Sequence, residues 1–133
     1  MKFNEFYSLT IVHSRDIILV KGVDYMNITK QKSQKTFDKQ AADYDTNIQG
    51  EHARKLYKPI IENLKNKNIH SILDLGCGTG ALLKEIKELN IAEQLFGIDI
   101  SPNMLEIAEN KLGNDATLIL GDSERLPFED SSF

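Results

Sequence analysis

The stretch SILDLGCGTGALL, residues 71–83, decides the fold. A short apolar run of strand type leads into Gly76, Gly78 and Gly80, and a leucine-rich segment of helical period follows. Glycine at three alternating positions permits positive φ angles and lets a ligand lie against bare backbone. The start of the following helix adds N–H groups without helical partners. The stretch therefore predicts a strand, a ligand-binding turn and a helix.

The apolar pattern after the turn predicts a helix at 81–89, a strand at 95–100, a helix at 102–112 and a strand at 116–120. Ser101 followed by Pro102 is typical of a helix start, and Gly113 is typical of a helix end. Strands that alternate with helices run parallel and are joined by right-handed crossovers. The predicted fold class is therefore α/β, with a Rossmann-like parallel sheet of which three strands are present.

Two helices are predicted ahead of the sheet. One begins at Thr36, where Phe37 and Tyr44 share a helical face, and the second covers residues 51–66. Pro59 lies inside the second helix. Because an interior proline costs about 3 kcal/mol, we expect a kink or a break near residue 58.

The first residues of the chain have a different character. Two β-rich runs, 9–12 and 16–20, predict a β-hairpin, and a polar connector follows them. We therefore divide the chain into an N-terminal extension with a hairpin and connector, residues 1–35, and a ligand-binding domain, residues 36–133.

The composition fits one globular domain of 133 residues, 41% of them hydrophobic. No apolar run approaches the roughly 18–20 residues that cross a bilayer, and one cysteine cannot form an internal disulfide. The net charge is −4, and the lysines of the N-terminal half are scattered among acids. We predict a cytoplasmic protein with no membrane and no nucleic-acid partner. The three histidines show no metal-ligand spacing, so no metal site is predicted.

Glycine-rich turns of several kinds bind nucleotides, and their spacing separates them. The phosphate-binding P-loop requires a lysine that this turn lacks. The dinucleotide pattern G-x-G-x-x-G is met only in part, because Ala81 stands in the place of its third glycine. An NAD-binding turn therefore stays an alternative.

Acids follow each predicted strand and indicate what the turn binds. Asp99 ends the second strand, 19 residues after Gly80, where a carboxylate can accept both hydroxyls of a ribose. Asp74 and Asp122 lie near the ends of the first and third strands. Three acids repel a pyrophosphate but not a ligand with a ribose, an amino group and a positive centre. S-adenosylmethionine has these features.

Four segments carry a resemblance to a known family. The segments ILDLGCGTG, GIDIS and GDSERLPFEDSSF, preceded by FDKQAADYD at 37–45, resemble in order and spacing the motifs of class I S-adenosylmethionine-dependent methyltransferases. The likeness is strongest to the small-molecule group that includes the ubiquinone and menaquinone biosynthesis enzymes, and it covers about residues 36–133. It implies a methyltransferase whose partner is a small-molecule methyl acceptor.

The resemblance also implies where the methionine end of the cofactor lies. The backbone of Gly76 and Gly78 would hold it, with Asp74 nearby. Cys77 belongs to the same turn, where a small side chain fills the tight bend. Tyr44 would close over the methionine end from the N-terminal side.

The nucleoside end is implied to lie along the next two strands. Asp99 would bind the ribose diol and Ile100 would pack on the adenine. Asp122 would accept the adenine amino group, and the Ser123 backbone would define that edge. None of these residues makes or breaks a bond, because a site for methyl transfer mainly supplies alignment and dehydration.

The resemblance implies a fourth strand beyond Phe133, so we expect the cofactor-binding portion of a longer enzyme, with little or no turnover by residues 1–133 alone. The edge of the first parallel strand, residues 71–75, would then be bare. We expect the 9–20 hairpin, a second copy of the chain or a C-terminal portion to cover it, and we favour the last. Self-association through this edge is also predicted. Two alternatives remain: an NAD-binding oxidoreductase, and a non-catalytic nucleotide-binding or regulatory module.

Overall fold

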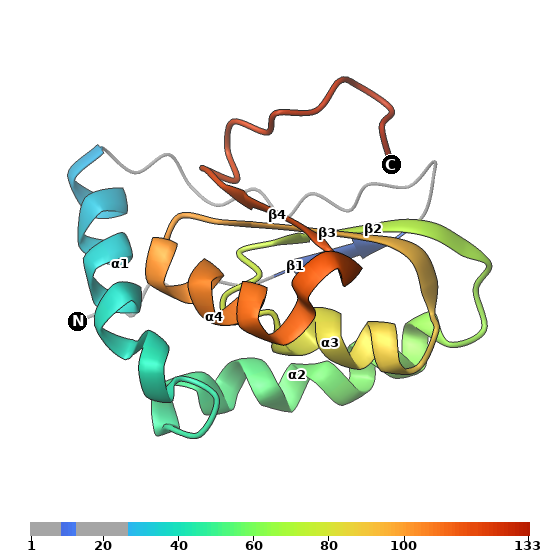
Figure 1. The fold of residues 1–133 in the computed structure, drawn as a ribbon, viewed down its shortest axis with the longest axis horizontal. Coiled ribbons are helices and arrows are strands. Elements are labelled where there is room, and N and C mark those ends of the chain that lie inside the picture. Colours follow the sequence, from blue (N-terminus) through green and yellow to red (C-terminus); the bar gives the residue numbers. More distant parts are fainter. Residues whose placement is uncertain (1–8, 13–26) are drawn as a thin grey trace.

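The computed structural model describes residues 9–12 and 27–133. These residues form an α/β fold in which helices cover one face of a four-stranded sheet (Figure 1). In chain order the elements are β1 (Leu9–Val12), α1 (Asn27–Gln40), η1 (Ala41–Asp43), α2 (Ile48–Leu64), β2 (Ile69–Leu75), α3 (Ala81–Glu88), β3 (Ala92–Asp99), α4 (Pro102–Leu112), η2 (Gly113–Asp115) and β4 (Thr117–Leu120).

The sheet has the strand order β1-β2-β3-β4. β2 pairs in parallel with β3, and β3 pairs in parallel with β4, as the sequence predicts. Leu75 lies opposite Ile98, and Asp99 lies opposite Leu120, so the carboxyl ends of the three parallel strands meet at one edge of the sheet. Ligands of parallel α/β sheets bind beyond this edge.

β1 lies antiparallel to β2, with Leu9 opposite Leu75 and Val12 opposite Ile72. The N-terminal strand therefore covers this edge, as the first of our three alternatives predicted, and the C-terminal portion that we favoured is not what covers it here. The β1 backbone supplies the hydrogen-bond partners that a bare β2 edge would lack. The predicted second arm of the hairpin, residues 16–20, lies outside the described residues. β1 occupies the Ile72–Leu75 part of the edge on which we based self-association, and self-association stays a prediction.

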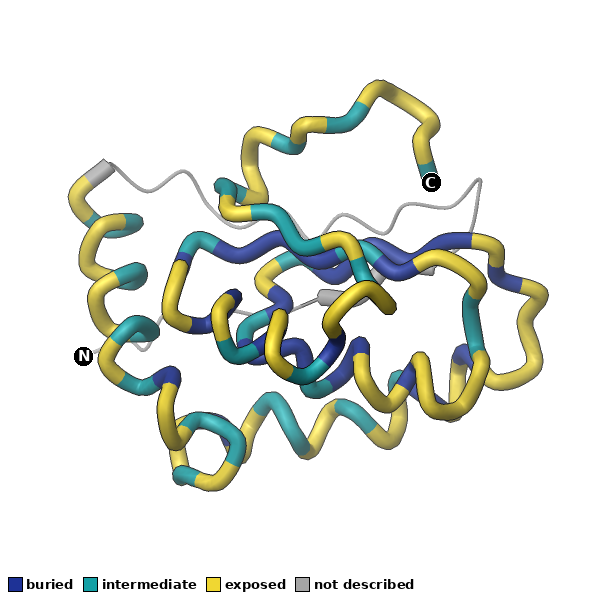
Figure 2. Tube along the Cα trace, viewed as in Figure 1, coloured by how far each residue is buried: buried dark blue, intermediate teal, exposed yellow. Residues whose placement is uncertain are grey.

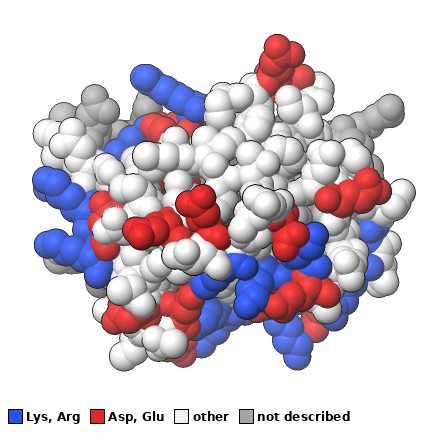
Figure 3. Space-filling model, viewed as in Figure 1, with Lys and Arg blue, Asp and Glu red and all other residues white. Residues whose placement is uncertain are grey.

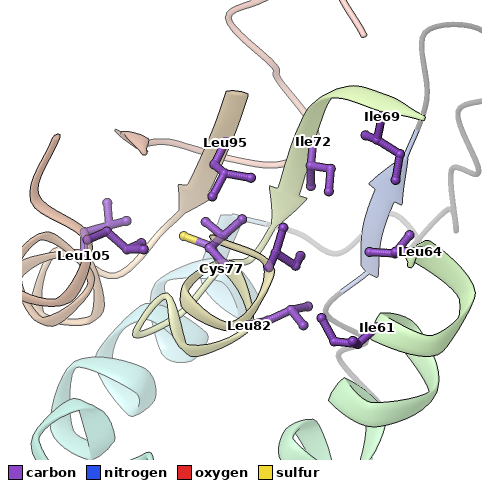
Figure 4. Packing of buried hydrophobic residues seen from close by; sticks show 11 residues of the cluster. Ile61, Leu64, Ile69, Ile72, Cys77, Leu82, Leu95 and Leu105 are labelled. Atoms are coloured by element: carbon purple, nitrogen blue, oxygen red, sulfur yellow. The ribbon is translucent and has the colours of Figure 1, made fainter. Parts of the chain in front are cut away.

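The core lies between the sheet and the helices α2, α3 and α4. Figure 2 shows the buried residues concentrated along the central strands and on the helix faces turned toward them. Leu83 and Ile86 of α3 are fully buried, as is Ile72 of β2. In Figure 4, Ile61 of α2 faces Leu82 of α3 below the sheet. Burial of an aliphatic side chain of this size contributes roughly 1.5–3 kcal/mol, so this layer holds the parallel strands in place.

The segment after β4 passes over the opposite face of the sheet (Figure 1). Phe96 of β3 is there in edge-on contact with Phe128 and Phe133, at centroid distances of 5.9 and 5.1 Å. The neighbouring Leu95 belongs to the core on the helical side. The two faces of β3 are thus covered by different parts of the chain, as the alternation of side chains along a strand requires.

In the C-terminal half of the chain, local sequence signals predicted the helix ends correctly. The Ser101 hydroxyl accepts the Met104 N–H at 3.1 Å, and Pro102 is in the first turn of α4, which confirms the predicted start. α4 ends at Leu112 with Gly113 as its C-cap, also as predicted. Asn90, predicted as the end of α3, has a φ of 51° one residue beyond the C-cap.

The N-terminal helices differ from the prediction in two ways. α1 begins at Asn27 rather than at Thr36, and we had assigned those first residues to a polar connector because they have no apolar stripe. α2 continues through Pro59, so the break considered near residue 58 is absent. Pro59 and Lys55 are both exposed, so water can hydrogen-bond the Lys55 carbonyl that proline leaves without a helical donor. Within the described ranges, no helix is long and apolar enough to span a bilayer.

Candidate functional site

The glycine turn between β2 and α3 has the backbone that the sequence predicts. Gly76, Gly78 and Gly80 have φ angles of 75°, 54° and 71°, a region that costs other residues roughly 1–2 kcal/mol each. A Cβ at either of the first two would meet no atom within 4 Å, whereas one at Gly80 would lie 2.8 Å from Leu112 Cδ1 and 3.0 Å from Ala108 Cβ. Two glycines therefore leave an open surface, and the third lets α3 pack closely on α4.

The N–H groups of this turn point into the protein. Four of them donate to protein oxygens: Gly76 and Cys77 to the Ile98 carbonyl (2.7 and 3.1 Å), Gly78 to Asp99 Oδ2 (2.8 Å), and Gly80 to the Cys77 carbonyl (2.9 Å). A phosphate-binding turn presents such groups to its ligand. These four N–H groups are therefore not available to a phosphate on the open surface of the turn, in agreement with the acids that disfavour a pyrophosphate in the sequence.

Asp99, at the end of β3, is fixed by the backbone on both sides. Its Oδ2 accepts the Gly78 N–H and its Oδ1 accepts the Ser101 N–H, each at 2.8 Å. Burial raises the pKa of Asp99, and the hydrogen bonds from Ser101 and Gly78 oppose that rise. A carboxylate offers about four acceptor positions, and the N–H groups of Gly78, Ser101 and Ile100 occupy up to three of them. The side chain is held in place by the backbone and can still accept a hydrogen bond from a ribose hydroxyl.

Cys77 and Asp74 are buried beneath the turn. Asp74 is 1% exposed and Cys77 is 6% exposed. Figure 4 shows Cys77 among Ile72, Leu82 and Leu95, and a Cβ at Gly97 would lie 2.8 Å from its Sγ. Burial, and then the nearby carboxyls of Asp74 and Asp99, raise the pKa of this thiol. Its side chain fills the bend and is no thiolate, so a ligand on the open surface could reach only its backbone.

Asp122, just after β4, already has a cationic partner. Lys30 of α1 contacts Asp122 Oδ2 at 2.7 Å and Glu124 Oε2 at 2.5 Å. Burial alone would raise the pKa of Asp122, but the hydrogen bonds from Lys30 and from the Glu124 N–H outweigh it and lower that pKa. The sequence prediction had no cation here. Next to Asp122 in the chain, Ser123 is exposed, and Ile100, directly after β3, is half-buried.

Tyr44 follows η1 and comes close to the same edge. Its ring is edge-on to Phe37, with centroids 6.2 Å apart. Burial raises the pKa of the Tyr44 phenol, and the Asp99 carboxylate raises it further. The neighbouring Asp45 accepts the Thr79 hydroxyl of the glycine turn, so the position of Tyr44 is compatible with the predicted role in closing the site.

Residues 30–45, which we name the cap segment, cross the ends of all three parallel strands. Lys30 reaches Asp122 beyond β4, and the Ser101 hydroxyl beyond β3 donates to Asp38 at 2.5 Å. Beyond β2, the Thr79 hydroxyl donates to Asp45 at 2.5 Å, and Lys111 of α4 pairs with the same carboxylate. The sequence analysis missed Lys30, Asp38 and Lys111 because partners so far apart in the chain leave no local signal.

Charge on the molecular surface does not gather into one basic patch on the face that Figure 3 shows. Lysines and arginines are interspersed there with acids. A hollow of about 360 Å³ lies next to the start of α3, and its lining includes both acidic and basic side chains. The lining residues are Asp45, Arg54, Tyr57, Ala81, Lys84, Glu85, Glu88 and Lys111. In the described part of the chain, no group of three or more His, Cys, Asp or Glu side chains could hold a metal ion.

Comparisons with known proteins agree with this architecture. Residues 72–133 match the family model described as a methyltransferase domain. The demethylmenaquinone methyltransferase of Thermotoga maritima is 35% identical over 108 residues, 79% of this chain and 47% of that protein. The malonyl-[acyl-carrier protein] O-methyltransferase of Anoxybacillus flavithermus is 37% identical over 89 residues, 65% of this chain and 32% of that protein.

A solved structure, the complex of DhpI with S-adenosylhomocysteine, matches with a TM-score of 0.56 at 19% identity. The match covers 69% of this chain and 44% of DhpI, and at this identity it shows the fold alone. The chain is therefore similar to the class I S-adenosylmethionine-dependent methyltransferases, and the methyltransferase family model is matched over residues 72–133. It spans less than half the length of the two curated relatives named above.

Proposed function

We propose that this chain is the cofactor-binding portion of an S-adenosylmethionine-dependent methyltransferase that acts on a small molecule. The observation that carries the proposal is Asp99, which the backbone of Gly78 and Ser101 aims at an open turn whose own N–H groups point inward. This arrangement can accept hydrogen bonds from a ribose but offers little to a pyrophosphate. The family match and the small-molecule relatives support the same function.

The residues at the turn fit the methionine end of the cofactor. The open faces of Gly76 and Gly78 leave room for it, because a Cβ at either position meets no atom within 4 Å. Asp74 lies buried, and Tyr44 lies in the cap segment next to Asp45, which accepts the Thr79 hydroxyl of the turn. Cys77 would contribute through its backbone alone. The carboxylates around the turn favour an amino group and a sulfonium over a phosphate.

The nucleoside would extend from Asp99 toward β4. The ribose hydroxyls would donate to Asp99, and the half-buried Ile100 would pack against the adenine. Asp122 would accept the adenine amino group and share its carboxylate with Lys30, while Ser123 would border the ring. Hydrogen bonds to a charged acceptor contribute roughly 1.5–3 kcal/mol each, so the diol contact would be the strongest single recognition element.

The chemistry needs little from these side chains beyond alignment. When bound, S-adenosylmethionine supplies a methyl group activated by the positive charge on its sulfur. The glycine turn and Asp99 would fix the cofactor, and the cap segment would exclude water from its methionine end. No catalytic residue is assigned within residues 1–133. The methyl acceptor, the cytoplasmic location and the division at residue 36 stay predictions.

Calorimetric titration with S-adenosylhomocysteine, S-adenosylmethionine and NAD tests this proposal. We expect S-adenosylhomocysteine and S-adenosylmethionine to bind more tightly than NAD. We expect Asp99→Ala to weaken the binding of S-adenosylhomocysteine by about 10- to 100-fold through loss of the diol contact. Tighter binding of NAD would favour an oxidoreductase. Equal affinity of the wild type and Asp99→Ala would contradict the assigned ribose site. Binding without methyl transfer by the full-length protein would favour a non-catalytic module.

A further inference from the structure

The turn that carries Tyr44 is held by one arginine from the following helix. Residues 44–47 connect η1 to α2, and Arg54 lies in the second turn of α2. Its Nη1 donates to the Tyr44 carbonyl at 2.7 Å and its Nη2 donates to the Asn47 carbonyl at 2.6 Å. Because the guanidinium is planar and rigid, two such bonds fix the spacing and direction of both carbonyls.

Gly50 provides the space for this arrangement. A Cβ at Gly50 would lie 2.0 Å from the Tyr44 carbonyl oxygen and 2.5 Å from Arg54 Nη1. Its N–H also donates to the Asn47 side chain at 2.8 Å, which caps α2. Glycine is a poor helix former, so its presence in the first turn of α2 is explained by the close approach of the Tyr44 backbone.

The same turn faces the candidate site. Tyr44 is half-buried and its ring lies edge-on to Phe37, and burial and the Asp99 carboxylate both raise the pKa of its phenol. The next residue, Asp45, accepts the Thr79 hydroxyl and thereby ties the turn to the glycine turn. A change in the backbone at Tyr44 would therefore displace its ring relative to the site.

We propose that Arg54 is a positioning residue for the cofactor site: its two hydrogen bonds, made in the space that Gly50 leaves, hold the Tyr44 backbone so that the Tyr44 ring covers the methionine end of the cofactor. The part that concerns the cofactor rests on the proposed function. Arg54 acts through Tyr44 and not through its charge. Lysine keeps the charge but loses the paired hydrogen bonds, so Arg54→Lys separates the two roles.

The first test needs no cofactor. Protein labelled with 3-fluorotyrosine, whose phenol ionises at lower pH than that of tyrosine, is titrated by ¹⁹F NMR, and Tyr44→Phe assigns the resonance. The positive charge of Arg54 by itself lowers the pKa of the Tyr44 phenol. Loss of that charge alone would therefore raise this pKa, whereas release of the ring from its buried position near Asp99 would lower it.

We expect the pKa of the Tyr44 phenol to fall in Arg54→Met, in Arg54→Lys and in Gly50→Ala. Lys55→Met is the matched control, because Lys55 is on the same helix, exposed, and paired only with Glu51 among the contacts described for it; we expect no change in this variant. A rise in Arg54→Met together with no change in Arg54→Lys would overturn the inference, since charge alone would then explain the effect.

The second test measures S-adenosylhomocysteine binding in a double-mutant cycle. We expect Arg54→Met and Gly50→Ala each to weaken binding by about tenfold, and Arg54→Met to add less than about twofold when Tyr44 is already alanine. An undiminished effect in the Tyr44→Ala background would show that Arg54 acts independently of Tyr44 and would overturn the inference. If the wild type binds no adenosyl ligand, the proposed function fails, while the ¹⁹F titration still decides how Arg54 acts on Tyr44.

Discussion

The two sides of the candidate site are held by different forces. The sheet and its helices are held by apolar burial, with Ile72, Leu83 and Ile86 fully buried and the glycine turn hydrogen-bonded mainly to β3. In the cap segment, Ala41 is the one buried residue, and its contacts with the strand ends are mostly ion pairs and polar hydrogen bonds. The sheet with its helices and the glycine turn, which we call the floor of the site, is therefore formed before a ligand arrives. The cap segment, which is the cover of the site, is attached weakly enough to move.

The largest effect that this comparison predicts is on the floor. Leu83→Ala removes a fully buried side chain of α3 and should lower the free energy of unfolding by about 2–5 kcal/mol, as core truncations do. Leu89→Ala is the matched control at the end of the same helix, where the side chain is 48% exposed, and it should cost less than about 1 kcal/mol. Urea denaturation measures both. Similar costs for the two variants would mean that the packed layer is not the source of stability.

The glycine turn should separate stability from binding. Gly80→Ala meets Leu112 Cδ1 at 2.8 Å in addition to its positive φ, so it should destabilise the fold by about 2 kcal/mol or more. Gly78→Ala carries only the backbone strain of about 1–2 kcal/mol, but its methyl group projects into the open surface.

Thermal unfolding and calorimetric titration with S-adenosylhomocysteine distinguish these two variants. We expect Gly80→Ala to have the lower melting temperature of the two variants. We expect Gly78→Ala to lose more affinity for S-adenosylhomocysteine relative to the stability that it loses. If Gly78→Ala binds as well as the wild type, the open surface of the turn is not where the cofactor lies.

A smaller effect is predicted for the cover. Lys30→Met removes the contacts with Asp122 and Glu124 and should lower the free energy of unfolding much less than Leu83→Ala does, because the Lys30 side chain is partly exposed and salt screens such pairs. Native-state hydrogen exchange should show faster exchange in α1 and unchanged protection in β2 and β3. High salt should have the same effect on the wild type. Loss of protection throughout the sheet would show that the cap segment is part of the core.

The smallest effect is a response of the cover to acid. The ion pairs with Lys30 and Lys111, after opposing the effect of burial, lower the pKa values of Asp122 and Asp45 below the ordinary value of 3.8. Their stabilisation is therefore present above pH 3.8 and is lost as the pH falls through the lowered values. NMR titration of the carboxyl carbons should show both midpoints below 3.8 and a return of the Asp122 midpoint toward 3.8 in Lys30→Met.

Local sequence signals were enough for the floor. Strand and helix periods predicted the parallel order, the Ser101 and Pro102 pair predicted the start of α4, and the glycines predicted positive φ. Each of these features depends on residues close together in the chain, where spacing reports directly on geometry. The position of Asp99 at the tip of β3 followed from the same pattern.

The cover could not be predicted in the same way. The first residues of α1 carry no apolar stripe, so their helix gave no periodic signal. Lys30 and Asp122 are 92 residues apart, and nothing in the sequence distinguishes this lysine from its neighbours in α1. The pairing of β1 with β2 was one of three alternatives that the sequence left open, and the contact of Arg54 with the Tyr44 carbonyl is a backbone feature that it gave no sign of. Such contacts depend on the assembled fold and not on local pattern.

A crystal structure of the protein with S-adenosylhomocysteine tests the central claim most directly. The account predicts both ribose hydroxyls within hydrogen-bonding distance of the Asp99 carboxylate, about 2.5–3.0 Å between oxygens, and the homocysteine end along Gly76 and Gly78. A ligand bound elsewhere, or a ribose turned away from Asp99, would contradict it.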